Sequence, residues 1–443
     1  MNHGTEQQDL DDGLLLRWGR AEDIEAVSAF NVKWHSDDED NPEEWLATWT
    51  RELMNGSHPT TSATDFTLVV DTKADNKVVS TCCLISQTWT YAGVPFGCGR
   101  PELIATDPAY RRRSLVRQQM NMLHAKSEAR GELVQAITGI PWFYRQFGYE
   151  MTLELSGSRA FQWGALGQSW LTSEAKKFRL RPATVSDIPT LQTLYTKHYA
   201  AGLVKTVREA AIWHFSGFAA NRQSPEGLHL FVIETAAGET AAYVEFQQWG
   251  HWFVVHELAV YPQFALRDIG MFLLNWFKEE AERRNKERKQ PITYVNFGFG
   301  SVHPLYEAID SYLGELRRPY AFYVRVPDVA AFLQHIAPVL EERLAQSSLR
   351  GFEGKLRLNF YRQQLALTFE AGKIKAVSPY TAEDYHDADA LFPELTFYHL
   401  LFGHRTLEEI RTIWPDCYTL NSQAAVLLNI LFPKRPSWIR PLG

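Results

Sequence analysis

The chain of 443 residues has few cysteines, no long apolar run and no excess of positive charge. Its four cysteines show neither CxxC nor any other metal-ligand spacing, so we expect no disulfide framework and no metal site. No stretch of about 18 apolar residues occurs, so no membrane-spanning helix is expected. The first residues lack the basic and apolar regions of a secretory signal. These absences together predict a cytoplasmic protein that does not act on a membrane.

The charge balance is mildly acidic. Lys and Arg number 45 and Asp and Glu number 52, which gives a net charge of −7. This balance argues against a protein whose main partner is nucleic acid, and it suits cationic or neutral partners. Hydrophobic residues make up 45% and charged residues 22%, the composition of a folded globular chain. At roughly 100–200 residues per domain, the length predicts about two to four domains.

An internal repeat is visible in the pattern of elements. Residues 14–30 read as a strand followed by an amphipathic helix, and residues 177–195 read the same way. Each copy then turns through a proline, Pro108 or Pro262, into a long helix. Between these points the sequence predicts strands over 66–72, 77–92, 102–106, 228–235, 240–250 and 253–261. We therefore expect an α/β (α+β) fold in which two similar mixed sheets are flanked by helices.

The last part of the chain has a different pattern. Residues 328–347 predict one amphipathic helix, and residues 355–378 predict a three-stranded meander. The segment 163–176 is predicted to be a linker. We place three domains at 1–162, 163–327 and 328–443.

The most informative segment for chemistry is 102–120. A strand ends, a proline follows, and a basic turn opens a helix. A helix N-terminus exposes unpaired N–H groups and positive dipole, which suit a pyrophosphate. Fixed positive charge is added by Arg111, Arg112, Arg113 and Arg117. The alternative is a solvated arginine cluster beside the acidic N-terminal region.

The order strand, proline, R-R-R-S-L-V, helix resembles the pyrophosphate motif of the GNAT acetyltransferase superfamily. Arg111 stands at its Gln/Arg position, while Ser114 and Val116 stand where the motif has glycines. The resemblance implies acetyl-CoA as co-substrate, with the thioester carbonyl polarised by backbone N–H groups near residues 104–106. The implied cofactor-binding residues are Ile104, Ala105, Thr106, Arg111, Arg112, Arg113, Ser114, Leu115, Val116 and Arg117.

A tyrosine lies in the segment 136–150, which resembles the GNAT segment where a tyrosine precedes a Phe-Gly-Tyr turn. The resemblance implies that Tyr144 protonates the departing CoA thiolate. Thiol and phenol pKa values near 8.5 and 10 make a phenol a workable acid for a nascent thiolate. The alternative is that Tyr144 merely packs among neighbouring aromatic residues.

The whole chain is similar to the Eis (enhanced intracellular survival) family, which has two GNAT modules and a C-terminal sterol-carrier-like domain. The most specific segments are 392–411, 414–417 and 427–438. The resemblance implies transfer of acetyl to a primary amine of an aminoglycoside, a polyamine or lysine, by direct attack. It also implies a homo-oligomer, a hexamer.

The general base has two candidates among the residues, while water or an amine that arrives already deprotonated could also serve. The family pattern uses the terminal carboxylate, which here belongs to Gly443, and the runner-up is Glu102 on the strand before the arginines. In the second half of the chain, Ala265, Leu266 and Asp268 stand opposite Arg111, Arg112 and Ser114. A carboxylate beside a pyrophosphate is repulsive. We therefore predict that the second half does not bind CoA and that the first half is catalytic.

Acceptor binding is predicted on the acidic stretch 34–45, where negative charge would attract a cationic amine. The residues named for it are Trp34, Asp37, Asp38 and Glu39, and Trp45 and Trp49 could add cation–π contact beside Trp34. The alternative is a solvated acidic loop, and His35 is interpreted as an ordinary histidine. The sequence thus favours an acetyl-CoA-dependent N-acetyltransferase. Two alternatives stay open: a non-catalytic acyl-CoA- or lipid-binding protein, and a transferase for longer acyl chains.

Overall fold

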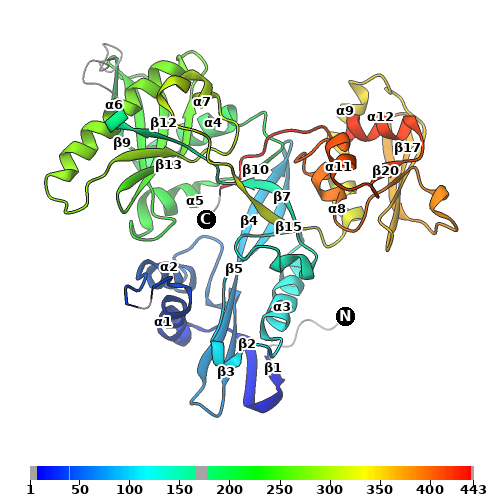
Figure 1. The fold of residues 1–443 in the computed structure, drawn as a ribbon, viewed down its shortest axis with the longest axis horizontal. Coiled ribbons are helices and arrows are strands. Elements are labelled where there is room, and N and C mark those ends of the chain that lie inside the picture. Colours follow the sequence, from blue (N-terminus) through cyan, green and yellow to red (C-terminus); the bar gives the residue numbers. More distant parts are fainter. Residues whose placement is uncertain (1–6, 39, 166–176, 441–443) are drawn as a thin grey trace.

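The computed structural model describes residues 7–38, 40–165 and 177–440, which form three lobes (Figure 1). The first lobe is coloured blue to cyan, the second mainly green and the third yellow to red in Figure 1. Within the described residues, no helix has the length and apolarity needed to cross a membrane.

The first lobe is built on a mixed sheet with helices on both faces. Among the described residues its strands are β1 (Gln7–Leu10), β2 (Leu14–Trp18), β3 (Phe66–Asp71), β4 (Lys77–Tyr91), β5 (Val94–Thr106), β6 (Glu132–Ile137), β7 (Glu150–Leu155), β10 (Val204–Thr206) and β15 (Tyr320–Arg325). The order is β1-β2-β3-β4-β5-β6-β15-β7, and β10 pairs with β4. Helices α1 (Ile24–His35) and α2 (Trp45–Met54) lie on one side of β5, and α3 (Leu115–Ala129) lies on the other (Figure 1).

Helix α3 forms where the sequence predicts it, directly after the turn that begins at Pro108. Its apolar residues fall on one face, so Leu115, Met120 and Leu123 are buried against the sheet. This packing fixes the direction of the helix, and its N-terminus meets the end of β5.

The second lobe repeats the plan of the first. Its strands are β8 (Arg159–Gln162), β9 (Phe178–Pro182), β11 (His229–Thr235), β12 (Thr240–Trp249), β13 (Trp252–Val260) and β14 (Tyr294–Phe297). The order β9-β11-β12-β13-β14-β8 matches β2-β3-β4-β5-β6-β15 of the first sheet. The parallel pair β13–β14 corresponds to the parallel pair β5–β6. Its helices are α4 (Ile188–His198), α5 (Ala210–His214), α6 (Leu266–Asn285) and α7 (Pro304–Ala308). The α/β fold class with mixed sheets flanked by helices is confirmed.

The two sheets exchange one strand each. β8 follows β7 in the chain but pairs with β14 in the second sheet. In return, β15 lies between β6 and β7 in the first sheet. The domain limits 162/163 and 327/328 stay a prediction. β8 lies within the predicted first domain but belongs to the second sheet, and β15 lies within the predicted second domain but belongs to the first sheet. The predicted linker 163–176 lies mostly outside the described residues.

The third lobe carries a smaller sheet. Its strands are β16 (Gly354–Asn359), β17 (Gln364–Glu370), β18 (Lys373–Pro379), β19 (Ala390–Leu391) and β20 (Tyr418–Thr419), and the first three form the predicted meander. Its helices are α8 (Val329–His335), α9 (Ala337–Ala345), α10 (Phe397–Leu401), α11 (Leu407–Ile413) and α12 (Ser422–Leu431). The single helix expected over 328–347 is wrong. It divides at Ile336, because Pro338 has no N–H to continue the hydrogen-bond ladder and occupies the first turn of α9.

Candidate active site

The turn between β5 and α3 has an unusual backbone. Arg112 and Ser114 adopt φ values of 64° and 58°, in the left-handed region that glycine enters most easily. The turn is braced at its start, where the Asp107 carboxylate accepts a hydrogen bond from the Ala109 N–H and faces Lys77 at 2.8 Å. The conformation ends at Ser114, after which the first N–H groups of α3 have no acceptor within the helix. Ser114 thus adopts the backbone geometry of a glycine position.

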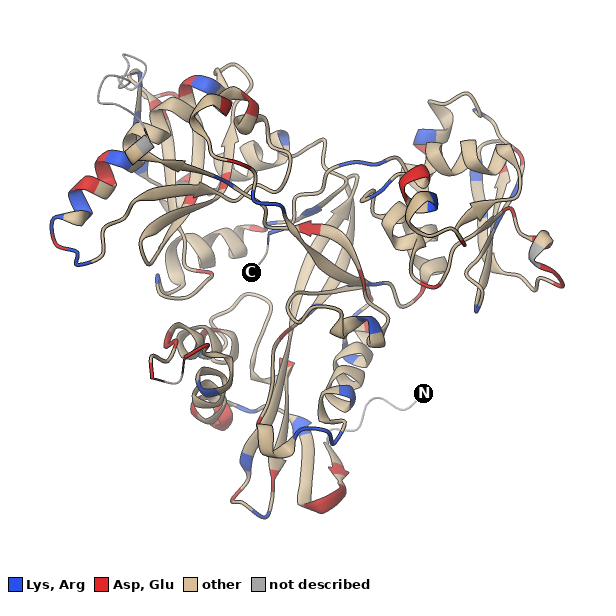
Figure 2. Cartoon of the chain, in the orientation of Figure 1, with Lys and Arg blue, Asp and Glu red and all other residues tan. Residues whose placement is uncertain are grey.

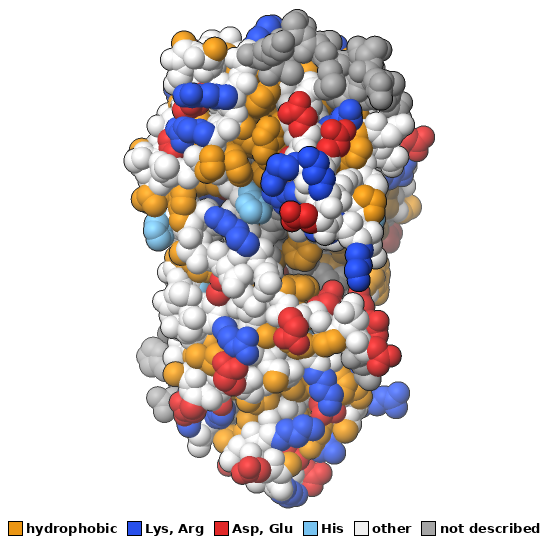
Figure 3. Space-filling model, turned by 90° about the vertical axis from the view of Figure 1, so that its left-hand side faces the viewer, with side chains coloured by type: hydrophobic (Ala, Val, Ile, Leu, Met, Phe, Trp, Pro, Cys, Tyr) orange, Lys and Arg blue, Asp and Glu red, His pale blue; other side chains and the backbone are white. Residues whose placement is uncertain are grey.

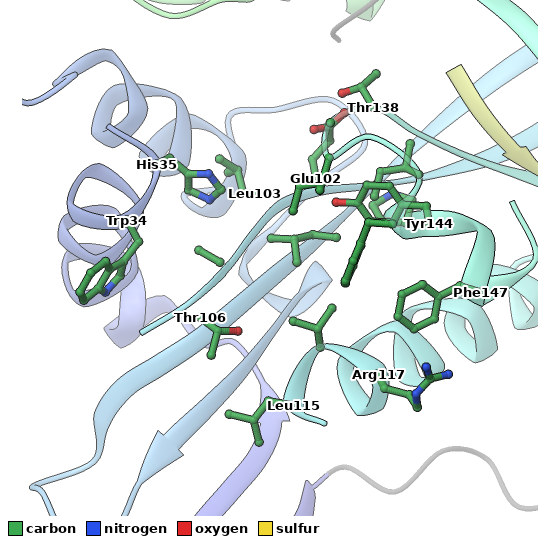
Figure 4. A pocket seen from close by; sticks show the side chains of 18 of the residues that line it. Trp34, His35, Glu102, Leu103, Thr106, Leu115, Arg117, Thr138, Tyr144 and Phe147 are labelled. Atoms are coloured by element: carbon green, nitrogen blue, oxygen red, sulfur yellow. The ribbon is translucent and has the colours of Figure 1, made fainter. Parts of the chain in front are cut away.

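A cavity of about 880 Å³ opens beside this turn. The parallel pairing of β5 with β6 extends from Gly97 to Gly99, and the cavity lies further along β5, at residues 101–106. Trp34 and His35 approach it from one side of β5, and Tyr144 and Phe147 approach from the other (Figure 4). Figure 2 marks basic residues at the start of α3, and Arg111, Arg112 and Arg117 from this region line the cavity. One end of the cavity is therefore cationic.

Glu102 lies on the central strand of the cavity wall. The register of β4 and β5 shifts next to it, and Leu103 adopts a φ of 51°, so β5 carries a bulge at this point. The carboxylate Oε1 lies 2.5 Å from Nη2 of the buried Arg100. Burial raises the pKa of Glu102 above its ordinary value, although Arg100 opposes this effect. Glu102 is thus a carboxyl group that can exchange a proton in the cavity.

Tyr144 lies on a short helical turn, η5 (Phe143–Phe147), and points toward β5 (Figure 4). Its ring packs against Phe143 and against Tyr323, whose ring centroid is 5.6 Å away. Burial raises the pKa of Tyr144 above its ordinary value, so the phenol stays protonated at neutral pH. Among the described residues its hydroxyl has no hydrogen-bond partner. The hydroxyl can therefore donate to a ligand.

The lining contains most of the cofactor residues predicted from the sequence, together with Tyr144, Glu102 and Trp34. The cofactor residues on the wall are Ile104, Ala105, Thr106, Arg111, Arg112, Ser114, Leu115, Val116 and Arg117. Arg113 is absent from the lining, and its guanidinium lies over the Tyr110 ring and 3.5 Å from the Asp12 carboxylate.

Two of the acidic residues predicted to bind the acceptor do not line the cavity. Asp37 and Asp38 follow the end of α1 and are absent from the lining. Glu39 and Gly443 lie outside the described residues. The roles of these four residues stay predictions.

One lining residue was missed by sequence reasoning: His35, which was interpreted as an ordinary histidine. Trp45 and Trp49 were considered only for cation–π contact with the acceptor. His35, Trp45 and Trp49 reach the cavity from the last turn of α1 and the first turns of α2. Burial lowers the pKa of His35, so its imidazole is neutral, and its Nε2 is buried without a hydrogen-bond partner in the described part of the chain. The only available signal was the run of tryptophans beside the acidic residues, which indicated aromatic contacts but not their direction.

The second lobe differs at the corresponding helix. Asp268 lies in the first turn of α6, and its carboxylate pairs with Lys177 Nζ at 3.0 Å. A second cavity of about 520 Å³ lies elsewhere, lined by strand β13 and by the segment Ser437–Arg440 among others. In the described residues, no member of α6 lines it. Arg111 and Arg112 thus have no basic counterpart here, and Arg267, which stands opposite Arg113, donates a hydrogen bond to the Ala308 carbonyl at 3.0 Å.

One family model matches the part of the chain that contains this site. Residues 25–152 match the family model of the acetyltransferase (GNAT) domain, and this range holds the arginine turn, Glu102 and Tyr144. The chain therefore contains a GNAT acetyltransferase domain, and it is an acyltransferase. No curated protein matches the sequence significantly.

Several solved structures share the fold over nearly the full length. A GCN5-related N-acetyltransferase from Anabaena variabilis is 12% identical, with a TM-score of 0.66 over 96% of this chain and 99% of that one. A conserved protein from Enterococcus faecalis, described as a probable N-acyltransferase, is 13% identical, with a TM-score of 0.66 over 97% and 99%. Eis1 from Mycobacterium abscessus is 12% identical, with a TM-score of 0.60 over 96% and 98%. These likenesses establish the fold.

Proposed function

We propose that the protein is an acetyl-CoA-dependent N-acetyltransferase that acts on a primary amine. The observation that carries the proposal is the single cavity that joins the basic N-terminus of α3 to Glu102 and Tyr144. A cationic helix start suits a diphosphate, and two proton-exchanging groups suit acyl transfer to an amine.

The cofactor side is proposed to be the turn before α3. Arg111, Arg112 and Arg117 line the cavity there and would neutralise a diphosphate, while the free N–H groups of the first helical turn would bind its oxygens. The wall at residues 104–106 would then face the thioester. These residues fit acetyl-CoA, which supplies the thioester whose carbonyl carbon the amine attacks.

The proton transfers are assigned to the two remaining groups. The amine nitrogen forms the C–N bond, the C–S bond breaks, and the Tyr144 hydroxyl gives its proton to the sulfur. The burial that raises the pKa of Tyr144 also raises that of a thiolate beside it, so the phenol remains a workable acid. The proton of the amine goes to a carboxylate. Glu102 is the carboxylate that the described residues place on the wall, and Gly443 remains the alternative.

The wider organisation follows from the same proposal. We take the protein to be Eis-like, with a catalytic GNAT module, a second module without CoA, and a sterol-carrier-like third domain. Leu401 and Leu428 of the third lobe are buried in a hydrophobic core that also includes Trp89 and Phe322 of the first sheet. A cytoplasmic homo-oligomer, a hexamer by resemblance, is part of this proposal.

Calorimetry with acetyl-CoA, followed by a thiol-release assay with primary amines, tests the proposed function. We expect saturable binding of acetyl-CoA and amine-dependent release of CoA. Binding without release for any amine would instead favour the non-catalytic acyl-CoA-binding alternative. A preference for longer acyl-CoA in the same assay would change the acyl group and leave the reaction class intact.

The backbone at Ser114 gives a sharper prediction. Ser114→Val should weaken acetyl-CoA binding about 10-fold or more, because a β-branched residue at this positive φ is strained by about 1–3 kcal/mol. The matched variant Ser114→Gly should bind within about 2-fold of the original chain, since glycine enters this region freely. Calorimetric titration of both variants measures the difference. Equal affinities would mean that the turn does not hold the cofactor in this conformation.

A further inference from the structure

The half of the cavity away from the arginine turn is walled by α1 and α2, and we call it the acceptor half. It is formed by Trp34, His35, Trp45, Leu46 and Trp49. The ring centroid of Trp45 lies 6.4 Å from that of Trp49 and 6.0 Å from that of Trp249 in the second lobe. Lys33 Nζ lies 4.7 Å from the centroid of Trp34. Such a wall favours a flat apolar body, and its π faces attract a cation.

Negative charge is scarce in the acceptor half. Of the described residues that line the cavity, Glu102 is the one carboxylate, and Arg100 already faces it. Asp37 and Asp38, which follow the end of α1, are absent from the cavity lining. A ligand with one ammonium group therefore finds one carboxylate, while further ammonium groups would be buried without a partner.

The carboxylate behind the aromatic wall is already engaged. Glu226, from the second lobe, accepts a hydrogen bond from the Trp49 indole N–H at 2.7 Å and lies 3.3 Å from His58. Although burial raises its pKa, His58 and Trp49 hold the pKa of Glu226 below its ordinary value. It fixes the Trp49 ring from behind and is almost fully buried, at 2% exposure. It offers nothing to a ligand.

His35 adds one neutral polar group. Its imidazole is uncharged, and its buried Nε2 has no partner among the described residues. A neutral imidazole can accept or donate a single hydrogen bond without attracting a second cation. Between the first and second lobes, the surface is hollowed, and hydrophobic side chains are exposed around the hollow (Figure 3).

We propose that the acceptor is an arylalkylamine: a monoamine on a short alkyl chain that carries one aromatic ring. The ring packs against Trp34 and Trp45, and the amine reaches Glu102 near the thioester. This inference rests on the proposed function, because it names the acceptor of the same site. It differs from the polycationic acceptors that the family resemblance implies.

A panel of amines tests the inference on the full chain with acetyl-CoA. We expect kcat/KM for 2-phenylethylamine to exceed that for n-butylamine about 10-fold or more, through ring contacts with the indoles. It should also exceed the values for spermidine and kanamycin. n-Butylamine carries the same amine without the ring, and the two polycations test the charge argument.

Variants of the wall locate the effect. Trp45→Ala should lower kcat/KM for 2-phenylethylamine about 10-fold and leave that for n-butylamine within about 2-fold. Trp34→Glu should raise the relative rate with spermidine by adding a second carboxylate. As a matched control, Trp163→Ala removes a half-buried indole of the second lobe, whose ring centroid lies 6.2 Å from that of Phe161. This variant should leave kcat/KM unchanged for both amines.

The outcomes separate the two proposals. Thiol release with a preference for spermidine or kanamycin overturns the arylalkylamine acceptor and leaves acyl transfer intact. Equal kcat/KM for 2-phenylethylamine and n-butylamine also overturns the arylalkylamine acceptor and leaves acyl transfer intact. If calorimetry shows no acetyl-CoA binding and no amine releases thiol, the proposed function fails, and the acceptor proposal fails with it.

Discussion

Replacing Tyr144 by phenylalanine should lower kcat about 100-fold or more, the usual contribution of a positioned general acid. The ring keeps its contacts with Phe143 and Tyr323, so the cavity wall stays in place. What disappears is the hydroxyl, which has no hydrogen-bond partner among the described residues and is free to donate to the leaving sulfur. Steady-state thiol release gives kcat, and calorimetry should show an acetyl-CoA Kd within about 2-fold of the original value.

A neighbouring tyrosine provides the control. Tyr149 is fully buried in the same aromatic cluster, but its hydroxyl is bonded to His124 Nε2 at 2.7 Å and does not line the cavity. Tyr149→Phe should cost about 1–3 kcal/mol of stability, because it leaves His124 without its partner, and should preserve kcat. If Tyr144→Phe keeps full turnover, or if both variants lose turnover equally, Tyr144 is not the acid.

The cofactor side of the site could be predicted from the sequence because its signals are local. A strand end, a proline turn and a helix start are contiguous over residues 102–120, so the free N–H groups and the arginines come together without help from the rest of the fold. The exception is Arg113, which stacks over Tyr110 because successive side chains of a turn point in different directions.

The acceptor half could not be predicted in the same way. Trp45 and Trp49 belong to α2, whose place on the sheet depends on packing between distant segments, including the second lobe through Trp249. His35 reaches the cavity because α1 ends beside the β5 bulge at Leu103. Sequence spacing identifies the apolar face of a helix, but it does not indicate which residue of that face meets a cavity.

The fold shows the same division. Runs of apolar and β-branched residues predicted β3, β4, β11, β12 and β13, because each of these strands carries such residues along most of its length. The strand exchange had no such signal. β8 and β15 are short, and their partners β14 and β6 lie far along the chain, so pairing depends on tertiary packing rather than on local pattern.

Because the two sheets exchange strands, a chain that ends at residue 162 should not fold. It lacks β15, which fills the first sheet between β6 and β7 and pairs with both. Phe322, Tyr323 and Val324 of β15 are fully buried. At about 1.5–3 kcal/mol for each large side chain, their loss removes about 5 kcal/mol or more, which is comparable to the whole stability of a domain, about 5–15 kcal/mol.

The missing strand also supports the site, since the Tyr323 hydroxyl accepts a hydrogen bond from the Trp142 N–H and its ring packs on Tyr144. We therefore expect the 1–162 fragment to show no cooperative thermal transition by circular dichroism and no acetyl-CoA binding. The matched rescue is the same fragment joined through a flexible linker to residues 318–327, which restores β15 and should recover a cooperative transition. A stable, acetyl-CoA-binding 1–162 fragment would show that the first sheet closes without the strand contributed by the second half of the chain.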